Sequence, residues 1–114
     1  MIKLSRNFSL YELIASGTAQ ANHLANTLDE KDVAKLKRLC TDILQPVRDH
    51  FGQPVKIRSG YRSAEVNALL NEAPNSRHTM CEAVDFRVSG VHLADVCDYI
   101  ANNLRFDILQ LEFP

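Results

Sequence analysis

A stripe of apolar residues between positions 33 and 51 is the feature that most constrains the fold of this chain. Its members recur at steps of three and four, which predicts a helix with one face buried in a core. In a chain of 114 residues, a helix of this length leaves room for one domain, residues 1–114, built around it. The stripe consists of Val33, Leu36, Cys40, Ile43, Leu44, Val47 and Phe51.

Both ends of this helix, and one point inside it, carry residues with strong conformational preferences. Thr27 and Glu30 have the spacing of a capping box, which predicts the start of the helix. Pro46 has no backbone N–H and predicts a kink within the stripe. Gly52, followed closely by Pro54, predicts the end, because glycine readily adopts the left-handed conformation of a helix terminus.

Shorter elements surround this helix. Capping residues at Ser9 and Ser63 predict two further helices, and an apolar stripe predicts another from Leu93 to residues 102–103. Because no parallel βαβ pattern joins the strands, we expect an α+β domain with a small antiparallel sheet packed against helices. The expected strands are residues 55–57, 83–88 and 106–113, and the expected loops are residues 17–26 and 75–82.

The strand expected at residues 83–88 holds a carboxylate on a rigid element. Val84, Phe86 and Val88 alternate with Asp85 and Arg87, which is the pattern of a half-buried strand. The apolar residues share one face, and the charged residues share the other. We therefore expect Asp85 to project away from the core.

Composition excludes several classes of protein. The 13 Lys and Arg residues nearly balance the 14 Asp and Glu residues, and the net charge of −1 gives no general attraction to nucleic acid. No apolar run approaches the roughly 20 residues of a membrane span, and residues 1–6 lack the apolar stretch of a signal peptide. We expect synthesis in the cytoplasm.

Three cysteines do not make a disulfide framework, and Cys40 and Cys97 fall on helical stripes as small core residues.

The segment from Ser76 to Asp85 is the richest in chemistry. It places His78 in a loop and delivers Asp85 seven residues later, and imidazole and carboxylate are both common zinc ligands. Taken alone, this spacing leaves a second interpretation open. His78 can instead be a surface residue, with Asp85 paired to Arg77 or Arg87.

Two blocks of sequence resemble a known family. Ser76, His78, Ala83 and Asp85 match the Ser-x-His-x-x-Gly-x-Ala-x-Asp signature of the zinc D-Ala-D-Ala carboxypeptidases and the related phage endolysin L-alanyl-D-glutamate peptidases. The fold of that family is shared with Hedgehog signalling domains. Residues 59–63, followed by residues 66–67, look like its second block, and residues 4–10 and 106–113 are similar to its phage-type members.

The resemblance implies a site for zinc and for a peptide. It implies that His78 and Asp85 bind the metal and that Arg62 stabilises the oxyanion or anchors a substrate carboxylate; a surface salt bridge is the alternative for Arg62. Ser76 either orients His78 or the substrate, or caps its loop. Glu112 is the nearest carboxylate on the last expected strand, and we consider it as a catalytic acid or base.

Two departures from the family pattern bear on this site. The family takes its third ligand, a histidine, from a Trp-Val-His type motif on a strand that would follow Pro114, so we expect a domain lacking its C-terminal strand. His23, His50 and His92 are expected to be structural or solvated. Cys81 stands where the signature has glycine, where it is a tolerated substitution with a partly buried thiol, a source of backbone strain, or a replacement zinc ligand.

The resemblance favours a zinc metallopeptidase-like domain that cleaves peptidoglycan peptide bonds next to D-amino acids. Its expected partner is the peptidoglycan stem peptide, and its expected place of action is the bacterial cell wall, in lysis of the phage or prophage type. The alternative is a catalytically incomplete module of the same fold that binds peptidoglycan or serves a phage structure. The exposed edge of residues 106–113 also predicts a homodimer through that strand.

Overall fold

The computed structural model describes residues 2–15, 20, 30–70, 77–81 and 83–105. Within these residues the fold is α+β, as the sequence predicts, but its strands form two antiparallel ribbons rather than one sheet. One ribbon pairs β1 with β2 and the other pairs β3 with β4. The elements are β1 (Lys3–Ser5), β2 (Phe8–Ser9), α1 (Leu10–Ile14), α3 (Glu30–Leu39), a π-helical segment (Cys40–Leu44), α4 (Gln45–Phe51), β3 (Val55–Ser59), α5 (Ala64–Leu69), a 3₁₀ turn (Arg77–Met80), β4 (Asp85–Val88) and α6 (Leu93–Asn103).

The predicted long helix is present and runs without interruption from Glu30 to Phe51. Just before Pro46 the helix contains the π-helical segment, in which the Gln45 N–H donates to the carbonyl of Cys40. This wider turn includes Asp42, whose carbonyl the ring of Pro46 would meet in a regular α-helix. The kink expected at Pro46 stays a prediction. Gly52 ends the helix as predicted, with φ of 65° and its N–H donated to the Arg48 carbonyl. Thr27, the predicted cap, lies outside the described residues.

The ribbon β1–β2 was not expected from the sequence, because strands of two or three residues carry too little periodicity to be recognised. A side chain of the long helix holds it. The amide oxygen of Gln45 accepts hydrogen bonds from the Ser5 hydroxyl (2.8 Å) and the Asn7 N–H (2.9 Å). Beside them, Arg6 forms an ion pair with Asp49 of α4.

The ribbon β3–β4 forms at the predicted positions, and its register carries a bulge. Val55 pairs with Val88 and Ile57 with Phe86, but the next pair is Ser59 with Asp85. One extra residue on β3 therefore brings Asp85 level with Ser59, next to Gly60. Asp85 is exposed and Val88 buried, which confirms the predicted alternation.

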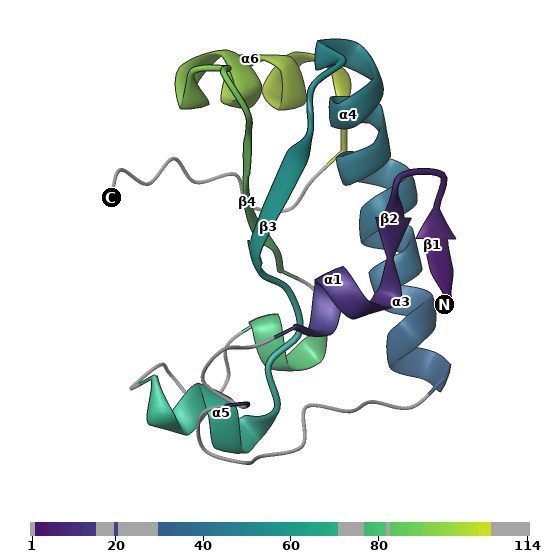
Figure 1. The fold of residues 1–114 in the computed structure, drawn as a ribbon, viewed down its shortest axis with the longest axis vertical. Helices are drawn as coiled ribbons and strands as arrows, with labels where there is room; N and C mark the ends of the chain where they lie inside the picture. The colour runs from purple at the N-terminus through teal and green to yellow at the C-terminus, as the bar shows by residue number, and fades with distance from the viewer. Residues whose placement is uncertain (1, 16–19, 21–29, 71–76, 82, 106–114) are drawn as a thin grey trace.

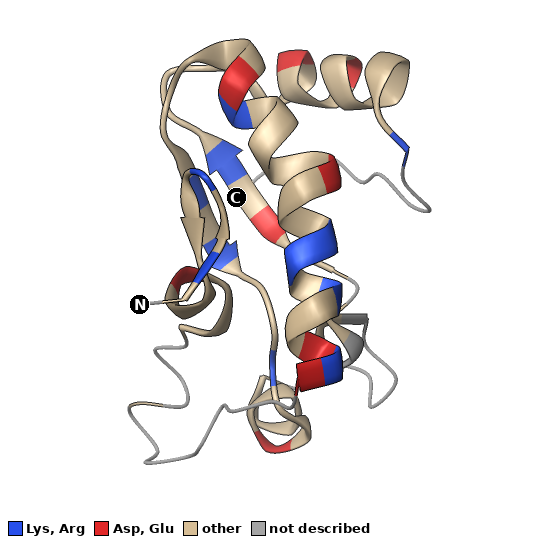
Figure 2. Ribbon diagram, turned by 90° about the vertical axis from the view of Figure 1, so that its right-hand side faces the viewer, with Lys and Arg blue, Asp and Glu red and all other residues tan. Residues whose placement is uncertain are grey.

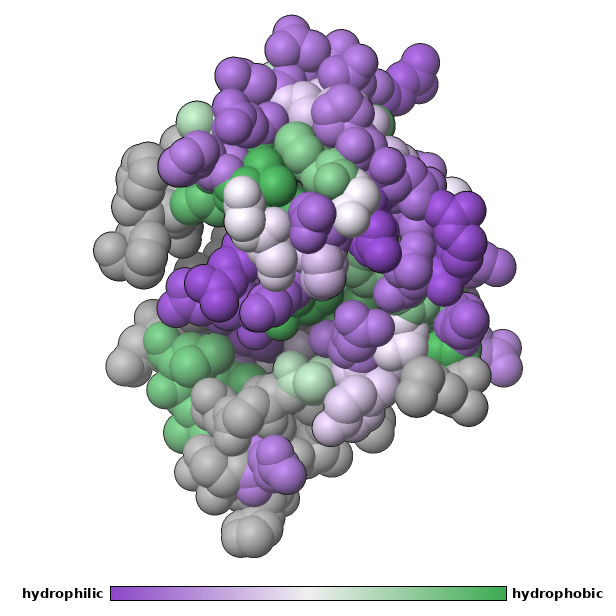
Figure 3. All heavy atoms as spheres, turned by 45° about the horizontal axis from the view of Figure 1, so that its top comes forward, coloured by the Kyte–Doolittle hydropathy of each residue, from purple (hydrophilic) through white to green (hydrophobic). Residues whose placement is uncertain are grey.

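The core lies between the β3–β4 ribbon and the long helix. Figure 1 shows α3 and α4 along one side of this ribbon and α6 across one end, with α5 near the other end. The surface visible in Figure 3 is mostly hydrophilic, with smaller apolar areas between the charged side chains. The buried apolar residues are Leu4, Phe8, Leu13, Leu36, Cys40, Leu44, Val47, Val55, Val66, Cys81, Val88, Val96 and Ile100.

The remaining helices confirm the predicted caps. Ser9 and Glu12 form the capping box of α1, and the Ser63 hydroxyl accepts from the Val66 N–H at the start of α5. Within the loop expected at residues 75–82, residues 77–80 form a 3₁₀ turn instead. Most of the loop expected at residues 17–26, the strand expected at 106–113 and the dimer expected through that strand concern residues outside the described part. Among the described helices, none combines the length and apolarity needed to cross a bilayer.

Candidate metal centre

The two sequence blocks that resemble the peptidase family meet because β3 and β4 pair. β3 ends at Ser59 and leads directly into Gly60 and Arg62, while β4 begins at Asp85, opposite Ser59. The 3₁₀ turn that carries His78 lies against the same end of the ribbon, where the Arg62 N–H donates to the His78 carbonyl (3.1 Å). Residues 16 or more positions apart in the sequence therefore share one site.

His78 is held by a backbone hydrogen bond. Its ring is buried, and Nδ1 lies 2.8 Å from the carbonyl oxygen of Gly60. A carbonyl oxygen only accepts, so Nδ1 carries the proton and donates it. Nε2 is then the nitrogen that faces Asp85, at 3.4 Å from Oδ2. A histidine fixed through one nitrogen by a backbone carbonyl is the usual arrangement of a metal ligand.

Asp85 is the second member of the pair. Its pKa is lowered, first by the hydrogen bond from His78 and then by the positive charges of His78, Arg62 and Arg58, against the opposing effect of partial burial. The carboxylate is thus the favoured form. When His78 is neutral, its Nε2 and the Asp85 carboxylate are two acceptors that face one another, and a shared cation satisfies both. The donor pair fits zinc, which readily binds imidazole nitrogen and carboxylate oxygen.

No third ligand joins this pair within the described part of the chain, where no group of three His, Cys, Asp or Glu side chains is arranged to hold a metal. His50 stacks on Tyr99, with ring centroids 4.0 Å apart, and His92 is exposed at the start of α6. Both are structural or solvated, as predicted. Ser76, His23 and Glu112 lie outside the described residues, so their roles stay predictions.

Arg62 is buried, with 8% of its surface exposed. This position does not fit the alternative of a surface salt bridge. Its guanidinium lies near enough to lower the pKa of Asp85, and its backbone holds the turn of His78. The structure therefore brings Arg62, His78 and Asp85 together, while the action of Arg62 on a substrate stays a prediction.

Gly60 supports the candidate site, and the sequence analysis did not single it out. A Cβ atom there would lie 2.3 Å from the carbonyl oxygen of Leu13, the same oxygen that accepts the Tyr61 N–H at 2.8 Å. Only glycine fits this contact with α1. Because the Gly60 carbonyl orients His78, the contact also sets the position of this candidate metal ligand. The sequence did contain a signal for this position, because Gly60 belongs to the block at residues 59–63 that resembles the peptidase family.

Cys81 adopts the left-handed conformation, with φ of 58°, directly after the 3₁₀ turn. This conformation explains why the family signature has glycine there, because a Cβ atom makes it costly. The side chain is 1% exposed and packs in the apolar core. The structure thus places the thiol in the core, and it joins no three-residue metal group among the described residues.

Comparison with known proteins gives one result. A family model described as peptidase M15 matches residues 6–113. The match covers nearly the whole chain and includes all five predicted site residues: Arg62, Ser76, His78, Asp85 and Glu112. Searches of curated proteins and of solved structures returned no match.

Proposed function

The chain belongs to the peptidase M15 family, and from this premise we propose that it is a zinc-dependent peptidase of the bacterial cell wall. Peptidases of this family are generally zinc-dependent and act on peptidoglycan-related substrates. The finer proposal is cleavage of a stem-peptide bond next to a D-amino acid, in lysis of the phage or prophage type. The observation that supports a zinc site is the orientation of His78 by Gly60, which directs Nε2 toward Asp85, while the finer proposal rests on the sequence resemblance.

His78 and Asp85 would hold the metal. The Gly60 carbonyl keeps the proton on Nδ1 of His78 and leaves Nε2 available as a ligand beside the Asp85 carboxylate. When bound, zinc lowers the pKa of its water and polarises the carbonyl of the scissile bond.

Arg62 would supply a fixed positive charge beside this pair. A buried guanidinium loses little conformational freedom when it binds an oxygen anion, and its planar N–H groups match a carboxylate or an oxyanion. We propose that Arg62 stabilises the oxyanion or binds a carboxylate of the peptide. The hydrogen bond from its backbone to His78 keeps the charge and the ligand in fixed relation.

A second candidate function is a binding module of the same family, which would bind peptidoglycan without cleaving it. Catalysis requires three protein ligands for zinc and one open position, and His78 and Asp85 would be two of the ligands.

Zinc binding and cleavage, measured on the same samples, test the proposal. The zinc content and zinc affinity of the full chain are compared with those of His78→Ala and Asp85→Asn, and the release of free amino groups from purified peptidoglycan reports cleavage. His92→Ala is the matched control, because His92 is exposed and distant in the fold from the site.

The two functions predict different results. A peptidase binds zinc and releases amino groups, and both properties are lost in His78→Ala but kept in His92→Ala. Binding of peptidoglycan without release of amino groups supports the binding module instead. Zinc binding that is the same in His78→Ala and in the unmodified chain would contradict the assignment of the metal ligand.

A further inference from the structure

The exposed face of the β3–β4 ribbon carries three positive charges. Lys56 and Arg58 are exposed and alternate along β3 with Val55 and Ile57, which pack against the core. The strand register places Lys56 directly opposite Arg87 of β4, which is also exposed. We call Lys56, Arg58 and Arg87 the basic strip.

The basic strip is an unfavourable arrangement for the fold itself. Like charges on directly opposite strand residues repel and destabilise the pair. No described carboxylate forms an ion pair with Lys56, Arg58 or Arg87, whereas Arg6, elsewhere on the surface, is paired with Asp49. Because Lys56 and Arg87 repel one another and no described carboxylate forms an ion pair with either, the cluster is suited to an anion from outside the chain.

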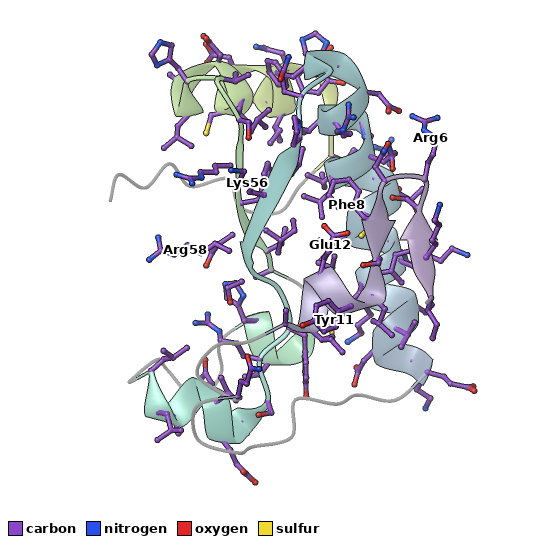
Figure 4. The ribbon with its side chains drawn as sticks, in the orientation of Figure 1. Arg6, Phe8, Tyr11, Glu12, Lys56 and Arg58 are labelled. Atoms are coloured by element: carbon purple, nitrogen blue, oxygen red, sulfur yellow. The ribbon has the colours of Figure 1, made fainter. Side chains whose placement is uncertain are left out.

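The basic strip leads to the candidate metal centre. Asp85 lies two residues before Arg87 on the same face of β4, and Arg58 lies at the bulge between the pairs Ile57–Phe86 and Ser59–Asp85. Figure 4 shows Lys56 and Arg58 on the side of β3 that faces away from α3 and α4. Figure 2 shows further basic positions on α3, on a separate surface of the molecule. A ligand along the basic strip would therefore have one end at His78 and Asp85.

We infer that the basic strip is a substrate subsite that binds the carboxylates of an anionic peptide lying in extended form along the β3–β4 ribbon. This inference rests on the proposed function and names the chemistry of its substrate. A stem peptide that carries several carboxylates would place one bond at the metal centre and its acidic groups over the basic strip. The strip then selects anionic over amidated peptides.

The proposed peptidase activity favours a peptide over a phosphate polymer as the ligand of the basic strip. A peptide with one bond at His78 and Asp85 would continue along the β3–β4 ribbon past Arg58 toward Lys56 and Arg87. A guanidinium group can bind each carboxylate of such a peptide with two hydrogen bonds. A chain with net charge −1 does not attract long polyanions in general.

Binding of two synthetic peptides to the full chain tests this inference. One is the stem pentapeptide with free carboxylates, and the other is the same peptide with every carboxylate amidated. The variant Lys56→Gln, Arg58→Gln, Arg87→Gln removes the basic strip. Its matched control, Lys31→Gln, Lys37→Gln, Arg38→Gln, removes the same three positive charges from exposed positions of α3. Circular dichroism establishes that both variants are folded.

The dissociation constants, measured by NMR titration, decide the outcome. We expect loss of the basic strip to raise the constant for the anionic peptide about tenfold, as for several weak ion pairs lost together, and to leave the amidated peptide unchanged. The α3 variant should bind both peptides as the unmodified chain does. Raising the salt concentration should reduce the preference for the anionic peptide.

Three results would overturn the inference. They are equal binding of the anionic peptide by the strip variant and the unmodified chain, an equal loss in the α3 variant, and tighter binding of inorganic tripolyphosphate than of the anionic peptide. Peptide cleavage is followed in the same samples. Absence of cleavage in every sample counts against the proposed peptidase, while the binding constants still decide the role of the basic strip.

Discussion

Two regions of the molecule use their polar groups in different ways. In the support region, residues 3–9 and 30–51, polar groups satisfy one another: Gln45 accepts from Ser5 and Asn7, and Arg6 pairs with Asp49. In the site region, residues 55–62, 77–81 and 83–88, the His78 ring is held in place by the backbone while its outer nitrogen faces the Asp85 carboxylate. The polar groups of the support region therefore bond to one another, whereas those of the candidate site have atoms available to a ligand.

The largest effect is expected at the contact that joins α1 to the site region. Gly60→Ala places a Cβ atom 2.3 Å from the Leu13 carbonyl, and backbone on both sides cannot yield cheaply. We expect a loss of about 3 kcal/mol in the free energy of unfolding, measured with urea, and weaker zinc binding through His78. Gly52→Ala is the control. Its Cβ atom would contact nothing within 4 Å, so its only cost is that of placing alanine at a left-handed φ of 65°. Equal losses in the two variants would contradict the role of the contact.

The next effect belongs to the support region alone. Gln45→Ala leaves the Ser5 hydroxyl and the Asn7 N–H without their partner, and we expect a loss of about 2 kcal/mol in the free energy of unfolding. Hydrogen exchange should rise in the β1–β2 ribbon and not around His78. Gln53→Ala, at an exposed position, should change neither. Weakened zinc affinity in Gln45→Ala would show that the two regions are not independent.

High pH should weaken the support region through Cys40. Burial, with the nearby charge of Glu12, raises the pKa of this thiol to about 12 from an ordinary value of 9.0. The unfolded chain therefore releases the proton first, so the free energy of unfolding falls as pH rises from about 9 toward 12, by up to about 1.4 kcal/mol per pH unit. Urea titrations across this range should show a shallower fall in Cys40→Ala. An unchanged slope would contradict the assignment to Cys40.

The buried cysteine of the site region has a conformational cost instead. Cys81→Gly relieves the strain of φ at 58° but removes a core side chain, whereas Cys81→Ala removes the thiol and keeps the strain. We expect the glycine variant to be the more stable of the two by about 1 kcal/mol in thermal or urea unfolding. If the alanine variant were equally stable or more so, the left-handed conformation would carry no cost here.

The smallest effect is expected for Arg6→Gln. The pair that it forms with Asp49 is exposed on both sides, so water screens the attraction, and the midpoint of unfolding should barely move at neutral pH. Hydrogen bonds from Gln45 and Arg6 lower the pKa of Asp49, so their contribution is present above the ordinary pKa of a carboxyl and is lost on acidification. A loss of stability in Arg6→Gln as large as the loss in Gln45→Ala would contradict this ranking of the two effects.

Much of the fold and part of the site could be predicted from the sequence. Local signals specified the long helix, the caps at Ser9 and Ser63 and the alternation of β4, because each depends on residues within one or two turns. The pair His78 and Asp85 was identified through a family signature. The β1–β2 ribbon was missed, because its strands are too short to show periodicity and the side chain that bonds to it, Gln45, is about 40 residues away.

The sequence by itself determined which described segments are helical, where the long helix ends, which faces are apolar and which residues are candidates for the chemistry. Only the tertiary structure decided how those residues act together. The bulge that aligns Asp85 with Ser59, the carbonyl of Gly60 that orients His78, and the exposed face shared by Lys56 and Arg87 all depend on pairing between distant segments. Local preference acts through neighbouring residues, whereas such contacts exist only after the chain has closed on itself.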